Sequence, residues 1–162
     1  MPLFIGFLAI ILDQLVKIYV VSNMKLGESI PVVQDIFHLT YVLNPGAAFG
    51  ILENHRWFFI AICVAILLGV AIFYKSIRRE CAMFRYGLGL LLGSAVGNLI
   101  DRIQNGLVVD FLDFRIWPVF NIADIAICVG AVMLVVSLLN ESWQDEHYKM
   151  GRIKTRRGGS TW

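Results

Sequence analysis

The chain has 162 residues, of which 58% are hydrophobic and only 16% are charged, and its mean hydropathy is +0.72. The length suits a single domain, and the composition lies away from soluble globular proteins, toward membrane proteins. A net charge of +2 without a basic stripe gives no support to a nucleic-acid-binding protein, and three cysteines form neither a disulfide framework nor a metal-ligand spacing.

Apolar stretches predict four transmembrane helices, because about 20 apolar residues cross about 30 Å of hydrocarbon. The predicted spans are residues 3–22, 57–74, 86–104 and 119–139. The first span contains Asp13 and Lys17 and lacks the basic start and cleavage site of a secretory signal, so we expect a retained helix. The expected fold class is a polytopic α-helical membrane protein, with one membrane-embedded domain over residues 1–162.

Basic residues are unequally distributed between the segments that join these spans. The loop 75–85 and the tail 141–162 together carry nine lysines and arginines, whereas the segments on the opposite side carry four. Basic residues accumulate in cytoplasmic loops. Both termini are therefore expected in the cytoplasm, and segments 23–56 and 103–118 outside.

The outer segment contains a predicted β-element over about 25–55. Within 32–44, the apolar residues Phe37, Leu39, Tyr41 and Leu43 recur at every second position, which is typical of a strand. The following "NPGAAFG" (44–50) combines Asn-Pro with two glycines and predicts a turn.

Ionisable residues inside the spans are candidates for function. Asp13 and Lys17 are four residues apart with the acid first, which favours a helical pair, so a purely structural ion pair is one interpretation. In the third span, Asn98, Asp101 and Arg102 share one helix face, although Asp101 and Arg102 could equally form a solvated boundary.

Gly89, Gly93 and Gly97 recur at every fourth position of the same span. Such a stripe of small residues lets another helix approach closely, so packing explains these glycines.

Three further aspartates lie in the apolar segment 108–124. Asp113, beside Arg115, is interpreted as a solvated loop charge. Asp124 precedes a long uncharged run, so we expect its carboxylate either to be paired with another group or to be functional. The topology brings Asp101, Asp110 and Asp124 to one plane at the outer membrane interface.

Two carboxyl groups held close together share a single proton, since both cannot ionise comfortably. An aspartic protease uses this state: the ionised member takes a proton from water while the other donates one toward the scissile carbonyl. The pattern does not say which member is the base. His38, His55 and His147 are dispersed, so neither a nucleophile triad nor a zinc motif is supported, and no spacing indicates another divalent cation.

Five blocks of the sequence, in this order, match the motifs of one known family. They are "DQLVK" (13–17), "NPGAAFG" (44–50), "GSAVGNLIDR" (93–102), "VVDFLDF" (108–114) and "FNIAD" (120–124). The chain thereby resembles the bacterial lipoprotein signal peptidases (signal peptidase II), which are membrane aspartic proteases. One departure is Ser94, which stands where many members have a glycine.

The resemblance implies that Asp110 and Asp124 are the catalytic pair. Residues that bind substrate or organise the site would be Asn44, Gly46, Asn98, Arg102, Asn121 and Ala123. Charged residues that support the architecture would be Asp13, Lys17 and Asp101.

The resemblance also implies a bacterial inner-membrane enzyme without metal or cofactor. Its partners would be membrane lipids and prolipoproteins carrying diacylglycerol on a cysteine, which the enzyme cleaves just before that cysteine. We expect a monomer and no nucleic acid.

A different class of protein is a small transporter or channel subunit, in which Asp13, Lys17 and Asp124 form an ion path. That function predicts charges spread through the depth of the membrane. Here the acids gather toward the outer end, which favours a reaction site near the surface. A structural scaffold would leave Asp124 and Asn98 unexplained.

Overall fold

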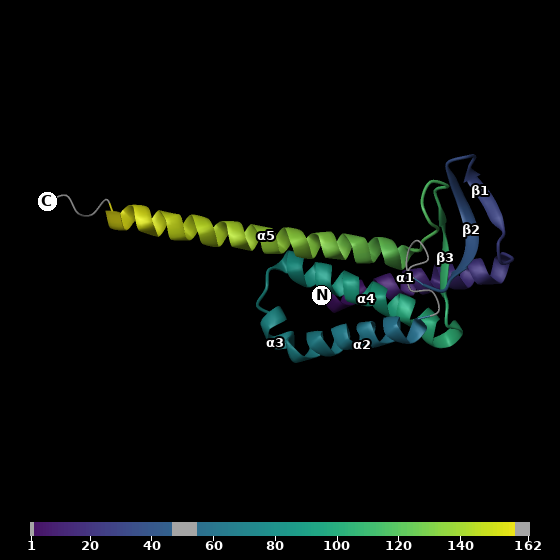
Figure 1. Ribbon diagram of the computed structural model, residues 1–162, viewed down its shortest axis with the longest axis horizontal. Coiled ribbons are helices and arrows are strands. Elements are labelled where there is room, and N and C mark those ends of the chain that lie inside the picture. The colour runs from purple at the N-terminus through teal and green to yellow at the C-terminus, as the bar shows by residue number, and fades with distance from the viewer. Residues whose placement is uncertain (1, 47–54, 158–162) are drawn as a thin grey trace.

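The chain folds into helices with a small sheet at one end, as the computed structural model shows (Figure 1). The structure describes residues 2–46 and 55–157, without the side chains of residues 3 and 141–157. The elements are α1 (Pro2–Asn23), β1 (Ser29–Val33), β2 (Phe37–Asn44), α2 (Arg56–Ile72), α3 (Tyr74–Ile77), α4 (Ala82–Asn105), β3 (Val108–Asp113) and α5 (Ile122–Arg157). Helix α4 is central, and α1, α2 and α5 each pack on it.

Three helices in the described part of the chain are long and apolar enough to cross a membrane. These segments are Phe4–Asn23, Ala82–Asn105 and Ile122–Asn140. Helix α2 is apolar but shorter, with 17 residues. Each predicted span overlaps one of these helices; α2 ends at Ile72, before the predicted end at 74, and α5 begins at Ile122 and continues to Arg157.

The outer surfaces of these helices are apolar. Phe7, Leu15, Leu68 and Leu139 are each between 58% and 65% exposed. Large continuous apolar surfaces are rare on soluble monomers. The exposure therefore indicates a surface that faces lipid.

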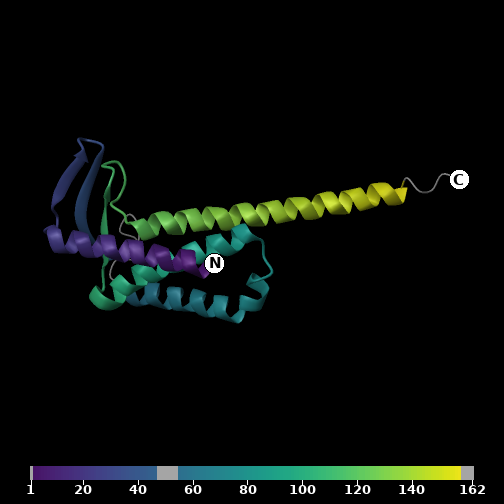
Figure 2. The ribbon, with the colours of Figure 1, turned by 180° about the vertical axis from the view of Figure 1, so that it is seen from behind.

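Helices α1 and α4 make contact through their backbones. Figure 2 shows α1 lying across α4. A Cβ atom added to Gly93 would meet the backbone of Gly6, and one added to Gly6 would meet the carbonyl oxygen of Gly89. Gly97 lies under the Asp13 side chain, because its Cβ would be 3.1 Å from Oδ2. The close approach that the glycine stripe predicted is therefore confirmed, and α1 is the partner.

The sheet is antiparallel, with strand order β1-β2-β3. The alternating segment 37–44 forms β2, as predicted, and residues 32 and 33 belong to a separate strand, β1. Asp35, with φ +59°, lies in a turn that separates β1 from β2. Residues 47–50 of the predicted turn lie outside the described residues.

Strand β3 was not expected, since the sequence predicted only a connection over 103–118. Val109 and Phe111 of β3 are buried against Val20 of α1 and against Met24, the residue that follows α1. A strand covered on both sides shows no apolar-polar alternation, so periodicity alone could not identify it. The strand fixes the position of Asp110, which pairs with Val42 of β2 in the sheet register.

A methyl group at the α1–α4 contact tests this packing. Gly93→Ala should destabilise the protein by about 1–3 kcal/mol, because backbone atoms of α1 must move to admit the new Cβ. Gly69→Ala is the matched control: nothing lies within 4 Å of the added atom, so its effect should stay within about 1 kcal/mol. The measurement is thermal unfolding in one detergent, and equal midpoints for both variants would contradict the proposed contact.

Candidate active site

Asp110 is a buried carboxyl group on β3, with 2% exposure. Its Oδ2 accepts a hydrogen bond from Nδ2 of Asn44 at 2.8 Å, and its Oδ1 accepts one from Nδ2 of Asn121 at 2.7 Å. Strand pairing brings Asn44 and Asp110 together, since β2 and β3 are neighbours. Both carboxyl oxygens are therefore held by amides from other segments.

Asp124 lies in the first turn of α5 and forms a reciprocal cap with Asn121. The Asp124 N–H donates to Asn121 Oδ1 at 2.9 Å, and the Asn121 N–H donates to Asp124 Oδ2 at 3.1 Å. This is the arrangement of a capping box, in which two residues satisfy free N–H groups at a helix start. The positive end of the helix dipole also favours a carboxylate there.

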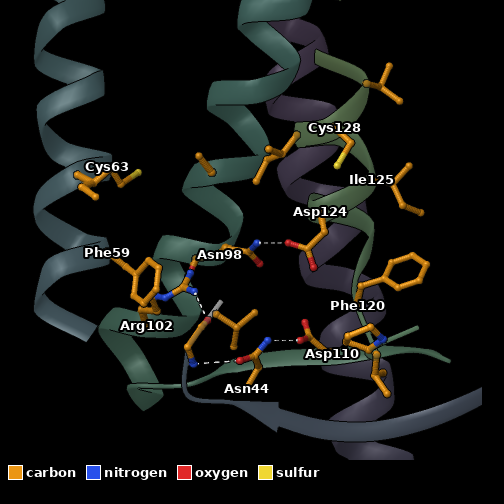
Figure 3. A pocket seen from close by; sticks show the side chains of 18 of the residues that line it. Asn44, Phe59, Cys63, Asn98, Arg102, Asp110, Phe120, Asp124, Ile125 and Cys128 are labelled. Carbon is orange, nitrogen blue, oxygen red and sulfur yellow. Dashed lines mark hydrogen bonds between the residues drawn. The ribbon is translucent and has the colours of Figure 1, made fainter. Parts of the chain in front are cut away.

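Two asparagine amides connect the two aspartates. Nδ2 of Asn98 donates to Asp124 Oδ1 at 2.9 Å, and Nδ2 of Asn121, which holds Asp110, also approaches Asn98 Oδ1 at 3.0 Å. Figure 3 shows Asp110 and Asp124 at one end of a cavity, with the dashed bonds from Asn44 and Asn98. The structure thus brings together the residues that the sequence predicted as a pair.

A buried ion cluster lies beside these amides. Lys17, which is 3% exposed, places its ammonium 2.7 Å from Asp13 and 2.8 Å from Asp101. The same ammonium donates to Asn98 Oδ1 at 2.8 Å. The predicted pair of Asp13 and Lys17 therefore exists, but it is part of a larger cluster that reaches the site.

The two acids of the cluster also hold backbone groups next to Asp110 and Asp124, the predicted catalytic dyad. Asp13 accepts the N–H of Ala123 at 3.0 Å, at the start of α5. Asp101 accepts the N–H of Val109 at 3.1 Å, one residue before Asp110. The sequence predicted Ala123 as a site residue, and its contribution is this backbone N–H.

Arg102 does not form the solvated pair with Asp101 that the sequence left open, since Asp101 is buried and pairs with Lys17. Its guanidinium donates to the carbonyl oxygen of Gly46 at 3.1 Å and lies 4.5 Å from the ring centre of Phe59. Gly46 in turn donates its N–H to Asn44 Oδ1 at 2.9 Å. Arg102 thereby joins α4, α2 and the end of β2 around the site.

The cavity has a volume of about 680 Å³, which lies within the range of ligand pockets. At one end it is lined by the polar residues Asn44, Asn98, Arg102, Asp110 and Asp124. The rest of its wall is mainly apolar and comes from α2, α4, α5 and the segment before α5. Figure 3 shows Cys63 of α2 and Cys128 of α5 farther along the cavity, away from Asp110.

Burial raises the pKa of Asp110 from 3.8 to about 7. The hydrogen bond from Asn44 opposes this rise, and the negative charge of Asp124 adds to it. A carboxyl group with a pKa near 7 is protonated in about half of the molecules at neutral pH.

The interpretation of Asp113 as a solvated loop charge is wrong. Asp113 is 5% exposed, and its carboxylate accepts hydrogen bonds from Thr40 Oγ1 at 2.8 Å and from the Arg115 N–H at 2.8 Å. Burial alone raises the pKa of Asp113, but these hydrogen bonds and the charge of Arg115 outweigh it and lower the pKa. Asp113 links β3 to β2 through Thr40, and it is not among the residues that line the cavity.

Sequence reasoning missed Gln14. Its amide donates to Asp101 Oδ1 at 2.8 Å and to the carbonyl oxygen of Gly97 at 3.1 Å. No motif marks it, although its place next to Asp13 on a membrane helix was a signal that a polar partner lay nearby. In the described part of the chain, no three His, Cys, Asp or Glu residues gather as metal ligands would.

Comparison with known proteins agrees with this geometry. The family model described as signal peptidase (SPase) II matches residues 5–140. The chain belongs to the signal peptidase II family. A lipoprotein signal peptidase of Halothermothrix orenii is 51% identical over 139 residues, which cover 86% of this chain and 92% of the relative.

Further relatives agree in sequence and in structure. The lipoprotein signal peptidase of Bacillus subtilis is 42% identical, over 85% of this chain and 92% of its own. A solved structure described as a bacterial membrane enzyme at 2.3 Å resolution has a TM-score of 0.81 and 33% identity, covering 87% of this chain and 88% of the other. A second one, at 1.9 Å, has a TM-score of 0.77, 34% identity and coverages of 85% and 92%. The predicted family, the signal peptidase II group of membrane aspartic proteases, is thus confirmed.

Removal of the Lys17 charge tests the ion cluster. Lys17→Met should destabilise the protein by about 3–5 kcal/mol, because Asp13 and Asp101 would remain buried without a counter-ion. Thermal unfolding in detergent measures the effect. Lys25→Met is the control, since Lys25 is exposed; an equally small loss in both variants would show that the cluster does not stabilise the fold.

Proposed function

We propose that this chain is an aspartyl endopeptidase that removes signal peptides from diacylglyceryl-modified prolipoproteins, cleaving just before the lipidated cysteine. The single observation that carries the proposal is the arrangement of Asp110 and Asp124, which line one cavity and share a pair of asparagine amides. Membership of the signal peptidase II family supports the same activity.

In this proposal Asp124 is the general base and Asp110 the general acid. Asp124 accepts the backbone N–H of Asn121 at the start of α5, the end of a helix where negative charge is generally favourable. Asp110 has a pKa of about 7, so its protonated form is available near neutral pH.

The proposed reaction moves two protons. Asp124 takes one proton from a water molecule, whose oxygen attacks the scissile carbonyl carbon, while Asp110 gives its proton to the carbonyl oxygen. The resulting tetrahedral intermediate breaks its C–N bond. The new amine, on the lipidated cysteine, receives the proton that Asp124 took, while the re-forming carbonyl returns a proton to Asp110, so the other product is a carboxylic acid and both aspartates are restored.

Asn98 and Asn121 are proposed as positioning residues. Each donates an amide hydrogen bond to one carboxyl group of the dyad and contacts the other asparagine. Carboxyl groups held in this way need no reorganisation when the charge moves, which is the general advantage of a preorganised site.

The cavity suits a substrate that is partly peptide and partly lipid. Its polar end carries the dyad and Arg102, whereas Ile62, Cys63 and Cys128 line the part between α2 and α5. We place the scissile peptide at the polar end and the apolar part of the substrate between the helices. Such a site needs an entrance from the membrane.

We further propose four spans with both termini in the cytoplasm of a bacterium, and the dyad near the outer interface of the inner membrane. Helix α2 rises about 26 Å at 1.5 Å per residue, close to the hydrocarbon thickness of about 30 Å. Arg56 lies 4.9 Å from the ring centre of Trp57 at one end, as in an interfacial anchor. The excess of basic residues in 75–85 and 141–162 supports this orientation.

A transporter receives no support from the described residues. The buried charged side chains are Asp13, Lys17, Asp101, Asp110 and Asp113. All of them lie toward the sheet end of the bundle, so an ion path through the depth of the membrane is lacking there.

Substitution of either dyad member tests the proposed activity. Asp110→Asn and Asp124→Asn should each lower the cleavage rate by roughly 10²- to 10⁴-fold, since each removes one proton-transfer step. The measurement is the gel shift of a diacylglyceryl prolipoprotein mixed with purified enzyme. Asp35→Asn, in an exposed turn, is the control and should retain full activity; undiminished turnover by either dyad variant would refute the assignment.

The pH dependence tests which member is the acid. The value of kcat/KM should decline as pH rises through about 7, because Asp110 then loses the proton that it donates. Asn44→Ala removes a hydrogen bond that lowers the pKa of Asp110, so this decline should move to higher pH. Profiles of the two proteins that coincide above pH 6 would speak against Asp110 as the general acid.

A further inference from the structure

A second cavity, of about 190 Å³, lies at the end of the bundle away from the sheet. Figure 1 shows α3 at this end, opposite β1, β2 and β3. The cavity is lined by parts of α1, α2, α3 and α4, with Arg78, Arg85 and Tyr74 among its residues. The peptidase reaction uses none of these three.

This end of the molecule is rich in unpaired positive charge. Between residues 73 and 85 the chain has Lys75, Arg78, Arg79 and Arg85 but only one acid, Glu80. The ion pairs found among the described side chains involve Lys17 and Arg115 instead. An excess of cations around a cavity favours a bound anion.

Arg85 has an unused donor. Its Nε is buried and has no hydrogen-bond partner in the described part of the chain. Buried donors normally have an acceptor, because leaving one unpaired is unfavourable. An acceptor from outside the described chain would satisfy Arg85.

The start of α4 adds to the attraction. Arg85 lies one turn into α4, whose first turn contains no acidic residue. Cations at this end are opposed by the positive pole of the helix dipole, and a bound anion would relieve both. The helix dipole is a secondary argument for a bound anion, after the cavity and its arginines.

The other wall of the cavity is apolar. Val70 on α2 and Leu88 and Leu92 on α4 line it. Ile72 and Phe73, at the same end, are 75% and 65% exposed. An anion that reaches this cavity is therefore expected to carry hydrocarbon.

We propose that this cavity binds the phosphate of an anionic phospholipid, with Arg78 and Arg85 on the headgroup and the acyl chains along α2 and α4. Basic pockets between membrane helices on the cytoplasmic side bind anionic headgroups in this way. The proposed orientation places this end in the leaflet that faces the cytoplasm. The lipid would hold α2 to α4 at a site distinct from the dyad.

Lipid binding by the purified, full-length protein tests the proposal. Native mass spectrometry should find one phosphatidylglycerol retained in clear preference to phosphatidylcholine. Arg78→Gln and Arg85→Gln should each weaken that binding by about fivefold, the effect expected of one basic residue near an anionic headgroup. Arg79→Gln is the matched control: it removes the same charge one residue away, does not line the cavity, and should bind like wild type.

Inorganic phosphate separates the two sources of the anion. At millimolar concentration it should not displace the lipid; displacement would mean a phosphate site and would overturn the lipid assignment. Equal retention of the two phospholipids, or unchanged binding by Arg85→Gln, would also overturn it. If Arg85→Gln does not accumulate, Arg78→Gln decides alone: a fivefold loss supports the site and no loss refutes it. Cleavage activity in zwitterionic detergent, which should be unchanged in all variants, shows that each is folded.

Discussion

The buried ammonium group of Lys17 is the interaction on which the site depends. Its three N–H donors have three oxygens at 2.7–2.8 Å, from Asp13, Asp101 and Asn98. A charge inside a membrane protein is tolerated when it is balanced and hydrogen-bonded, and this one is both. Because the three oxygens come from α1 and α4, the cluster forms only when these helices are as close as their glycines allow. The ion cluster therefore depends on the close packing of Gly6 against Gly93.

The same cluster connects the fold to the proposed reaction. Asp13 holds the backbone of Ala123 and Asp101 that of Val109, so α5 and β3 are both attached to it. These two elements carry Asp124 and Asp110. The backbone segments that carry the dyad are thus held in place by hydrogen bonds to the acids of this cluster. The apolar cavity beside it has a second effect, since burial lets Asp110 keep a proton near neutral pH.

Several features could be predicted because they depend on local pattern. Long apolar runs predicted the helices, and a glycine at every fourth residue predicted a close helix contact. Strand β3 was missed, since both of its faces are covered and its residues do not alternate. The error over Asp113 followed from that omission: without β3 there was no neighbouring strand to supply Thr40, which donates to it. Gln14 was missed because one amide on a helix carries no motif.

By itself the sequence determined the class of protein and the number of apolar stretches, and its five ordered motifs predicted Asp110 and Asp124 as the two acids, because composition, periodicity and motifs are properties of the chain alone. The tertiary structure decided what surrounds those acids. Asn44 and Asn121 reach Asp110 from positions 66 and 11 residues away, and no spacing rule predicts such contacts. It also decided that Asp110 is buried, which raises its pKa to about 7. Burial and hydrogen-bond partners arise only when distant segments pack together, and they set the proton affinity of a carboxyl group.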